Sequence, residues 1–402
     1  MTAPPDGTNA SYTTVAGAPS PTRSAIASFD FQPRTRLVFG CGTVARLGAL
    51  AVELGFTRSL LVADRGLVTT GHVGLVEQIL AAAGVEVVPF YQFDVNPDTT
   101  MVEVGCAVAR VGVVDSIIGL GGGSSMDCAK GVNFLLSNGG QMADYRGYGK
   151  ASQPMLPMIG IPTTAGTGSE AQSYAVIADA ITHVKMACGD PKAAFRLAIL
   201  DPELTVSQPN QVTAASGFDA IAHAVETTTT TRRTAMSDCF AREAWRLLET
   251  NFESVLDRPN DINARAAMQL GAFYAGLAIE QSMLGAAHAC ANPLTARYQI
   301  THGVALAIML PYVVRWNSGV AAPLYAKLLG DAADADNPSE RLAIRLRELA
   351  NRAALPDRLE TEGVEREALP KLADEAARQW TGTFNPKPLT AADALELYRC
   401  AF

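Results

Sequence analysis

The sequence predicts an α/β domain with a mostly parallel sheet, followed by an all-α domain. Two observations support this fold class. Up to about Asp201, short β-branched runs alternate with apolar segments of helical length, and such alternation produces a parallel sheet with helices on both faces. After Asp201-Pro202, helix-period patterns follow one another without strand signals. We therefore expect an α/β domain over residues 29–203 and a helical domain over 204–402. Residues 1–28, rich in Pro, Ser, Thr, Ala and Gly, are expected to form a flexible tail.

Each predicted element follows from its own pattern. The β-branched runs predict strands at 36–39, 59–63, 85–90, 116–120 and 158–161, with helices between them at 42–53, 74–83 and 99–111. Residues 174–188 alternate partially and are expected to form a hairpin that closes the first domain. In the second domain, helical patterns cover 211–227, 235–252, 262–279, 339–354 and 364–380.

Composition excludes several classes of function. The chain of 402 residues carries 32 Lys and Arg against 40 Asp and Glu, a net charge of −8, which excludes a basic nucleic-acid-binding footprint. The longest apolar stretch, residues 303–314, is too short to span a bilayer and is interrupted by Pro311. The seven cysteines are scattered and form no Cys-x-x-Cys pair, so we expect a soluble protein in a reducing cytoplasm.

The strand at 116–120 runs into a glycine-rich segment that precedes a helix. Gly119, Gly121, Gly122 and Gly123 occupy four of five positions, and Ser124 follows them. Such a turn aims backbone N–H groups and a helix N-terminus at one point, where a nucleotide pyrophosphate would bind. The alternative is a tight turn in which Ser124 only caps the helix, but a cap requires fewer glycines. A Walker-type loop is excluded, because Lys130 is followed by glycine instead of Ser or Thr.

Two further polar segments lie where predicted strands end. The loop at 162–170 is rich in Thr, Gly and Ser, and its hydroxyls could hold ribose or phosphate oxygens, although an ordinary capped loop would look the same. Asp64 follows the strand at 59–63. A carboxylate there would accept hydrogen bonds from ribose hydroxyls and repel a 2′-phosphate, which favours NAD over NADP; a solvated loop acid is the alternative.

Three of the five histidines fall within the second domain. Asp219 and His223 are four residues apart in a predicted helix and so share one face, and His288 and His302 lie among small and apolar residues that predict burial. Each histidine alone is explained by a core hydrogen bond. Together with the carboxylate, the three could equally share a divalent metal ion. His72 and His183 are expected in exposed loops without a chemical role.

Taken together, these segments resemble the iron-containing (group III) alcohol dehydrogenase family, over nearly the whole chain after residue 29. The matching positions are Phe39 to Gly42, Gly121 to Ser124 with Asp127 and Lys130, Pro162 to Glu170, Asp201-Pro202, Asp219 to Glu226, and His302 to Val304. The resemblance implies a Rossmann-like dinucleotide-binding domain and a helical metal-binding domain, in the architecture shared with dehydroquinate synthase. It also implies a homodimer or larger homo-oligomer.

The resemblance further implies site residues and a reaction. The metal ligands would be Asp219, His223, His288 and His302, holding Fe²⁺ or, in some members, Zn²⁺. The NAD-binding positions would be Gly121, Gly122, Gly123, Ser124 and Asp127, the cleft-lining Thr163, Thr164 and Thr167, and Asp64 on the adenosine ribose. The implied reaction is reversible hydride transfer between a small alcohol or diol, or the corresponding aldehyde, and C4 of the nicotinamide.

One position departs from the family. Many members carry a second histidine four residues after the His288 position, where this chain has Asn292, and an amide cannot act as an acid or base near neutral pH. The alternatives are a maleylacetate reductase or hydroxyacid-oxoacid transhydrogenase type of activity, a dehydroquinate-synthase-like lyase, or a nucleotide- or metal-binding protein that has lost catalysis.

Overall fold

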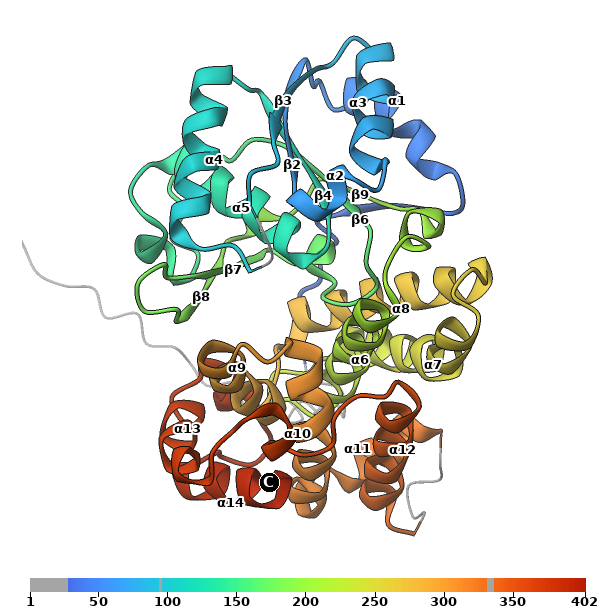
Figure 1. Ribbon diagram of the computed structural model, residues 1–402, viewed down its shortest axis with the longest axis vertical. Helices are drawn as coiled ribbons and strands as arrows, with labels where there is room; N and C mark the ends of the chain where they lie inside the picture. The colour runs from blue at the N-terminus through green and yellow to red at the C-terminus, as the bar shows by residue number, and fades with distance from the viewer. Residues whose placement is uncertain (1–27, 94–95, 331–335) are drawn as a thin grey trace, which may run out of the picture.

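The computed structural model describes residues 28–93, 96–330 and 336–402, and it places a sheet-containing half above a helical half (Figure 1). The sheet lies within residues 36–200, and α-helices follow from residue 210. This arrangement confirms the predicted fold class. The predicted tail lies outside the described residues except for residue 28, and the predicted domain boundary at 203 stays a prediction.

The main sheet has six strands in the order β1-β9-β6-β4-β2-β3, and every neighbouring pair is parallel. The strands are β1 (Arg36–Phe39), β2 (Arg58–Ala63), β3 (Glu86–Phe90), β4 (Ser116–Gly121), β6 (Met158–Pro162) and β9 (Leu197–Leu200). From β2 the chain continues outward to β3, whereas from β4 it continues in the opposite direction to β6. The carboxyl ends of β2 and β4 therefore border the crevice where ligands bind in open α/β sheets.

Five of these strands match the predicted ones, and β9 is a correction. The hairpin expected at 174–188 does not close the sheet-containing half, because β9 follows it and pairs with β1 and β6. The four residues of β9 are all buried, so this strand lacks the alternation of apolar and polar residues that marks a half-exposed strand.

Alternate residues of the strands face opposite layers of helices. Leu61 on β2 packs with helices α1 (Leu47–Glu53) and α3 (His72–Ala82), whereas Leu60 packs with α4 (Thr99–Gly112) and α5 (Gly123–Asn138). The short helix α2 (Arg65–Val68) follows β2 directly. The three helices predicted between these strands are confirmed, with the first beginning as a 3₁₀ turn at Thr43–Arg46.

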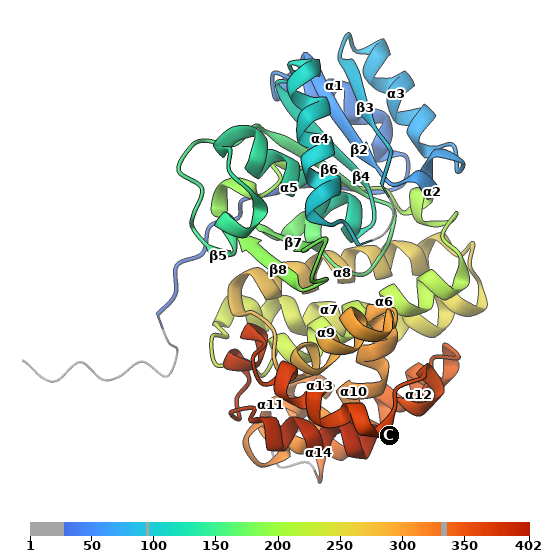
Figure 2. The same ribbon diagram turned by 60° about the vertical axis from the view of Figure 1, so that its left-hand side comes forward.

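A second sheet extends from the α/β half toward the helical half. It contains β5 (Gly147–Tyr148), β8 (Lys185–Gly189) and β7 (Tyr174–Ala178), in that order, and β7 and β8 form the predicted antiparallel hairpin. Figure 2 shows β7 and β8 between α5 and the helix α8 (Ile262–Ser282).

The helical half surrounds two deeply buried helices, α6 and α10. Its other helices are α7 to α9 and α11 to α14. The bounds are α6 (Asn210–Thr227), α7 (Ala235–Asp257), α9 (Ala286–Tyr298), α10 (His302–Trp316), α11 (Ser318–Leu329), α12 (Pro338–Arg352), α13 (Leu369–Ala376) and α14 (Ala391–Ala401). Helix α10 is apolar almost all round, as a central helix is, and α6 is buried along most of its length although it carries Asp219, His223 and Glu226.

Two sequence expectations fail here for local reasons. The helix expected at 364–380 is shorter, because α13 starts with Pro370 in its first turn and is flanked by 3₁₀ turns at Arg366–Ala368 and Trp380–Phe384. Helices α9, α10 and α11 each contain an internal proline, which a sequence pattern treats as a break, and they were not predicted.

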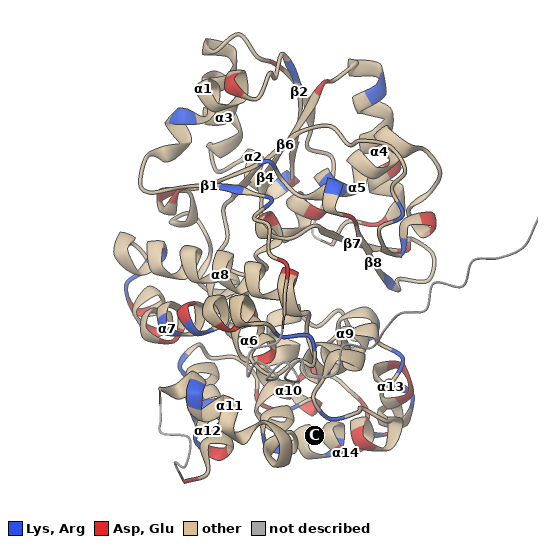
Figure 3. Ribbon diagram, turned by 180° about the vertical axis from the view of Figure 1, so that it is seen from behind, with Lys and Arg blue, Asp and Glu red and all other residues tan. Residues whose placement is uncertain are grey.

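The described surface carries both signs of charge, interspersed over both halves (Figure 3). No single helix among the described residues is long and apolar enough to cross a membrane. The helices α10 and α11 reach that length and composition only jointly, and they are bent by 112° at their junction.

Candidate metal and nucleotide site

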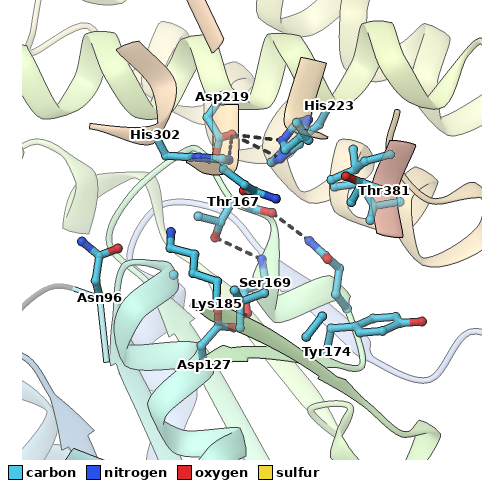
Figure 4. A pocket seen from close by; sticks show the side chains of 18 of the residues that line it. Asn96, Asp127, Thr167, Ser169, Tyr174, Lys185, Asp219, His223, His302 and Thr381 are labelled. Atoms are coloured by element: carbon cyan, nitrogen blue, oxygen red, sulfur yellow. Dashed lines mark hydrogen bonds and ion pairs between the residues drawn. The ribbon is translucent and has the colours of Figure 1, made fainter. Parts of the chain in front are cut away.

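A cavity of about 290 Å³ lies between the two halves. The α/β half contributes residues of the glycine-rich turn, the loop after β6 and the β7–β8 hairpin. The helical half contributes Asp219, His223, His288 and His302, together with Asn292 and the segment around Trp380. The structure thus brings the predicted nucleotide loop and the predicted metal ligands to one cavity (Figure 4).

The glycine-rich turn is held close to the loop that follows β6. Gly122 precedes the first residue of α5, and no side chain caps this helix, so the alternative in which Ser124 serves as the cap is wrong. A Cβ atom on Gly123 would lie 2.5 Å from Cγ2 of Thr167, and one on Gly122 would lie 3.3 Å from Cγ2 of Thr164. A Cβ on Gly123 would thus overlap Thr167, whereas one on Gly122 would make only a tight contact. With no side-chain cap on α5, its first N–H groups are left for a ligand at this edge of the cavity.

The other predicted nucleotide-binding residues lie along this edge. Ser124 lines the cavity and its Oγ accepts from the backbone N–H of Asn96 at 3.0 Å. Thr163 is buried, and its N–H donates to the carbonyl of Gly121 at 3.0 Å, which ties the two loops together. Asp64 lies at the end of β2, where it caps α2 through the N–H of Leu67.

Buried charges beneath the loops fix their positions. Asp127 lines the cavity and accepts a hydrogen bond from Ser169 at 2.6 Å. Lys130 is fully buried, and its Nζ donates to the carbonyl oxygens of Ser169 and Tyr174, both at 2.7 Å. Burial raises the pKa of Asp127 and lowers that of Lys130 to about 8, although each charge partly stabilises the other. Lys130 therefore orders the loop instead of reaching a phosphate.

The four predicted metal ligands converge around one carboxylate oxygen. Oδ1 of Asp219 lies 3.2 Å from Nε2 of His223, 3.7 Å from Nε2 of His288 and 3.9 Å from Nε2 of His302. Asp219, His288 and His302 each offer a ligand atom, all within 4.8 Å of one another. His288 is buried as expected, and Asp219 and His223 are buried too. Burial was also expected for His302, but its side chain keeps 27% of its surface exposed because it lines the cavity.

Three helices place these side chains. Asp219 and His223 are one turn apart on α6, as their spacing predicts. His288 lies in the first turn of α9, and His302 is the first residue of α10. The site is thus built where two helices begin beside the middle of a third.

The donor set fits a metal ion, because two of its buried atoms have no other partner. Oδ1 of Asp219 and Nε2 of His288 are buried without a hydrogen bond within the described part of the chain. Buried polar atoms are almost always paired, and a carboxylate with three imidazoles is a donor set typical of divalent iron or zinc. A cation between these atoms would satisfy both.

The protonation of the site suits metal binding. Burial lowers the pKa of His223 to about 4 and that of His302 to about 3, so both imidazoles are neutral at pH 7. Burial opposes ionisation of Asp219, but the neighbouring imidazoles outweigh it and hold its pKa well below the usual range. The site therefore offers one carboxylate and at least two neutral imidazoles as ligands.

Glu226 was not predicted as a functional residue, although it lies one turn beyond His223 on α6. Its Oε2 contacts Nδ1 of His288, and its Oε1 accepts from the N–H of Ala287 at 2.7 Å. Burial disfavours a charged His288, but Glu226 outweighs that effect and raises the pKa of His288 to about 9. At pH 7 without a metal ion, both ring nitrogens of His288 therefore carry a proton, and a metal ion at Nε2 would displace one of them. The carboxylate on Nδ1 fixes the ring so that Nε2 faces the ligand cluster.

Several cavity residues were also missed. Tyr174 and Lys185 come from the hairpin, and Gln379 and Trp380 precede or begin a 3₁₀ turn, whereas Asn292, which the sequence singled out, lines the cavity from α9. Tyr174, Val176 and Ala178 alternate along β7, so the partial alternation of this hairpin was the signal of a cavity-facing side. Lys185 extends from the Asp127 side toward the ligand cluster (Figure 4).

Sequence comparisons decide the family. Residues 33–202 match the profile described as iron-containing alcohol dehydrogenase, and residues 213–402 match that of the C-terminal part of the same family. The chain belongs to the iron-containing alcohol dehydrogenase family. It is therefore an oxidoreductase of the alcohol dehydrogenase class, and the family resemblance of its motifs is confirmed.

Individual relatives match nearly the whole chain. This chain is 32% identical over 370 residues to the NAD-dependent methanol dehydrogenase of Bacillus methanolicus, and the match covers 90% of this chain and 97% of the relative. Alcohol dehydrogenase 4 of Schizosaccharomyces pombe is 33% identical over 368 residues, covering 90% and 87%. A 1,3-propanediol oxidoreductase structure superposes with a TM-score of 0.90 at 30% identity, covering 94% of this chain and 100% of that one.

Proposed function

We propose that this alcohol dehydrogenase binds NAD and one Fe²⁺ ion in the cavity between its halves and reversibly oxidises a small alcohol to the aldehyde or ketone. One observation carries the proposal: the two predicted binding sites meet at one cavity. The open N-terminus of α5 and the unpartnered atoms of Asp219 and His288 face the same cavity. A nucleotide and a metal ion bound there would meet within reach of one small substrate.

The nucleotide-binding role is assigned to the α/β wall. We assign the pyrophosphate to the N–H groups at Gly122, Gly123 and Ser124, because the N-terminus of the sixteen-residue helix α5 provides unpaired donors and partial positive charge. We assign the adenosine ribose to Asp64, at the neighbouring strand end, where its carboxylate would accept hydrogen bonds from the ribose hydroxyls and repel a 2′-phosphate.

The metal-binding role is assigned to the helical wall. Asp219, His223, His288 and His302 would hold the ion, which supplies a Lewis acid that lowers the pKa of the substrate hydroxyl. Asp219 contributes a negative charge that partly offsets the ion's charge, and Glu226 keeps the ring of His288 oriented.

Asn292 limits how the proton of the substrate hydroxyl can leave. The side chain lies one turn after His288 and donates from Nδ2 to Oε1 of Gln379 at 3.1 Å. Neither amide titrates near neutral pH. The hydroxyl proton therefore leaves by another route, for which the nicotinamide ribose hydroxyls and water are the candidates.

The test is metal removal followed by reconstitution. Protein stripped with a chelator should not form NADH from NAD and 1-propanol, and one equivalent of Fe²⁺ per chain, added without oxygen, should restore turnover. A parallel Zn²⁺ arm distinguishes the two ions. Full dehydrogenase activity in the metal-free protein would contradict the proposal, and metal-dependent turnover without net NADH formation would indicate a transhydrogenase or lyase. A homo-oligomeric state and a cytoplasmic location stay predictions.

A further inference from the structure

We propose that Glu280 is a positioning residue that holds the α/β wall and the helical wall of the cavity at a fixed spacing. Glu280 lies near the end of α8, and it is not among the described residues that line the cavity. It therefore acts through its neighbours instead of touching a ligand. The inference rests on the proposed function, because the spacing matters for hydride transfer only if one wall binds the nucleotide and the other binds the substrate.

The carboxylate of Glu280 joins three segments of the chain. Its Oε2 accepts from the backbone N–H of Ser173 at 3.0 Å, and its Oε1 accepts from the hydroxyl of Ser173 at 2.7 Å. Oε1 also accepts from Nη1 of Arg34 at 2.8 Å. Ser173 directly precedes β7, and Arg34 lies two residues before β1 begins. One side chain of the helical half is therefore bonded beside the first residues of two strands of the α/β half.

This junction of Glu280, Ser173 and Arg34 is mostly buried. The Glu280 side chain is 7% exposed and Ser173 is 1% exposed, whereas the Arg34 side chain is 33% exposed. A buried carboxylate that loses its partners keeps the cost of leaving water, so its native contacts are strongly preferred. Exposed ion pairs constrain a fold less, because water and salt screen them. The junction therefore holds the two halves more tightly than a surface ion pair would.

On the α/β side, Ser173 connects the junction to the elements beneath the nucleotide loop. Tyr174 follows it, begins β7 and lines the cavity. The carbonyl oxygen of Tyr174 accepts from Nζ of Lys130 on α5 at 2.7 Å, and the same Nζ donates to the carbonyl oxygen of Ser169. A displacement of Ser173 would therefore move the hairpin and disturb the bonds with which Lys130 orders the loop after β6.

On the helical side, α8 itself forms part of the cavity wall. Ile279 lines the cavity directly before Glu280, and Met283 lines it just after α8 ends. One turn before Glu280, Gly276 lies against the loop after β6, since a Cβ atom on Gly168 would lie 2.7 Å from Cα of Gly276. A single close contact leaves the helix free to rotate about it. The carboxylate bonds of the junction, one turn further along α8, remove that freedom.

The segment before β1 crosses between the two halves at the junction. The ring centroids of Phe31 and Phe240 lie 5.8 Å apart, and Phe240 belongs to α7 of the helical half. The chain then enters β1 at Arg36, on the edge of the main sheet. Arg34 lies between these two points and pairs with Glu280. The segment thus ties an edge strand of the sheet to the helical half, and the ion pair is its polar contact there.

The test measures hydride transfer apart from binding. In a single turnover of the Fe²⁺-loaded enzyme with NAD and 1-propanol, Glu280→Ala should form NADH about 30- to 100-fold more slowly than wild type, because misplacing reacting groups by about 1 Å costs about 100-fold. Metal content and the affinity for NADH should stay close to those of wild type. A slower rate with 1,1-dideuterated 1-propanol identifies the measured step as hydride transfer.

Glu280→Gln keeps the size of the side chain and so guards against a general loss of structure. Its amide oxygen still accepts one hydrogen bond from Ser173, but the charge that pairs with Arg34 is gone. The single-turnover rate should therefore fall less than in Glu280→Ala, and Arg34→Met should lower it by a similar factor. The double variant should lose little more than Glu280→Gln alone, because both changes act through the same carboxylate.

Arg345→Met is the matched control for Arg34→Met. The Arg345 side chain is 30% exposed and pairs with Glu249 at 2.8 Å, but this pair joins α12 to α7 within the helical half. The single-turnover rate should be unchanged. The inference is overturned if Glu280→Ala transfers hydride as fast as Arg345→Met. It is also overturned if Glu280→Ala loses metal or NADH affinity by as large a factor as it loses rate.

Hydrogen exchange separates this inference from the dehydrogenase proposal, because it needs no turnover. In Glu280→Ala, the amides of residues 173–178 and 276–282 should exchange faster than in wild type, while those of α6 should be unchanged. If no alcohol is oxidised but exchange is faster in both segments, the dehydrogenase proposal fails and the junction stands. If alcohol is oxidised and exchange in Glu280→Ala is unchanged, the junction is wrong and the dehydrogenase stands.

Discussion

The two walls of the cavity are built on opposite principles. The α/β wall is defined by side chains that are missing, since a Cβ atom on Gly123 would overlap Thr167 and one on Gly122 would press against Thr164. The helical wall is defined by particular side chains, with an acid and three histidines around one point. The first wall offers backbone donors to an anion, and the second offers lone pairs to a cation.

The difference teaches what each half tolerates. A backbone site fails when an atom is added, because the close approach of ligand and chain is lost. A side-chain site fails when an atom is removed, because a buried charge or lone pair then lacks its partner. Substitutions in the two walls should therefore produce separable defects, one in nucleotide affinity and the other in metal content.

The largest effect is expected for His288→Ala. Removing this ligand takes away a buried donor and leaves Glu226 without its partner, so the protein should retain little metal. Turnover should fall by about a thousandfold, since several kcal/mol of charge stabilisation depends on the ion. The measurement is metal content by elemental analysis together with the rate of NADH formation.

The matched control for this histidine lies outside the cavity. His72, which begins α3 and bonds to Ser207 instead of lying in an exposed loop as expected, should tolerate alanine with metal content unchanged. NADH affinity should stay within about threefold of wild type in His288→Ala. Unchanged metal content and rate would show that the ligand assignment is wrong.

Gly123→Ala should break the other wall with a smaller effect. The new methyl group would overlap Thr167, and overpacking of this kind costs about 1–3 kcal/mol. Where that cost falls on the nucleotide-binding conformation, NAD affinity drops by about 5- to 150-fold. Metal content should not change. Gly74→Ala is the control, because a Cβ there meets no atom within 4 Å. Equal affinities in both variants would contradict the proposed close approach of the two loops.

A third prediction concerns the buried charges beneath the α/β wall. Burial raises the pKa of Glu170 to about 7 from an ordinary value of 4.5, so the folded chain favours the protonated acid. The stability that the protonated Glu170 contributes is complete below about pH 4.5 and is lost as pH rises through about 7. The difference in pKa corresponds to at most about 3 kcal/mol. Between pH 5 and pH 8, Glu170→Gln should lose less free energy of unfolding than wild type, as measured by denaturant titration.

If the free energy of unfolding changed equally between pH 5 and pH 8 in wild type and in Glu170→Gln, Glu170 would not control this pH dependence. Other titrating groups are common to the two proteins, and their contributions cancel in the comparison. The helical wall provides no equivalent test, because its buried carboxylates, Asp219 and Glu226, both contact histidines of the proposed metal site.

The sequence predicted local features well and long-range ones poorly. Asp219 and His223 lie on one helix, so their spacing sufficed to place them on one face. The approach of Glu226 to His288 joins residues from two helices, and α9 was not expected because Pro293 lies inside it. Gln379 and Trp380 belong to a 3₁₀ turn without a periodic pattern. The pairing of Asn292 with Gln379 therefore had no signal in the sequence.

The contact between Gly123 and Thr167 also bears on how this protein can vary. The two positions are 44 residues apart in the chain, yet they share one volume at the cavity edge. A larger residue at position 123 would be accepted only together with a smaller one at 167. The steric constraint is one-sided, because a smaller residue at 167 alone would create no overlap with Gly123.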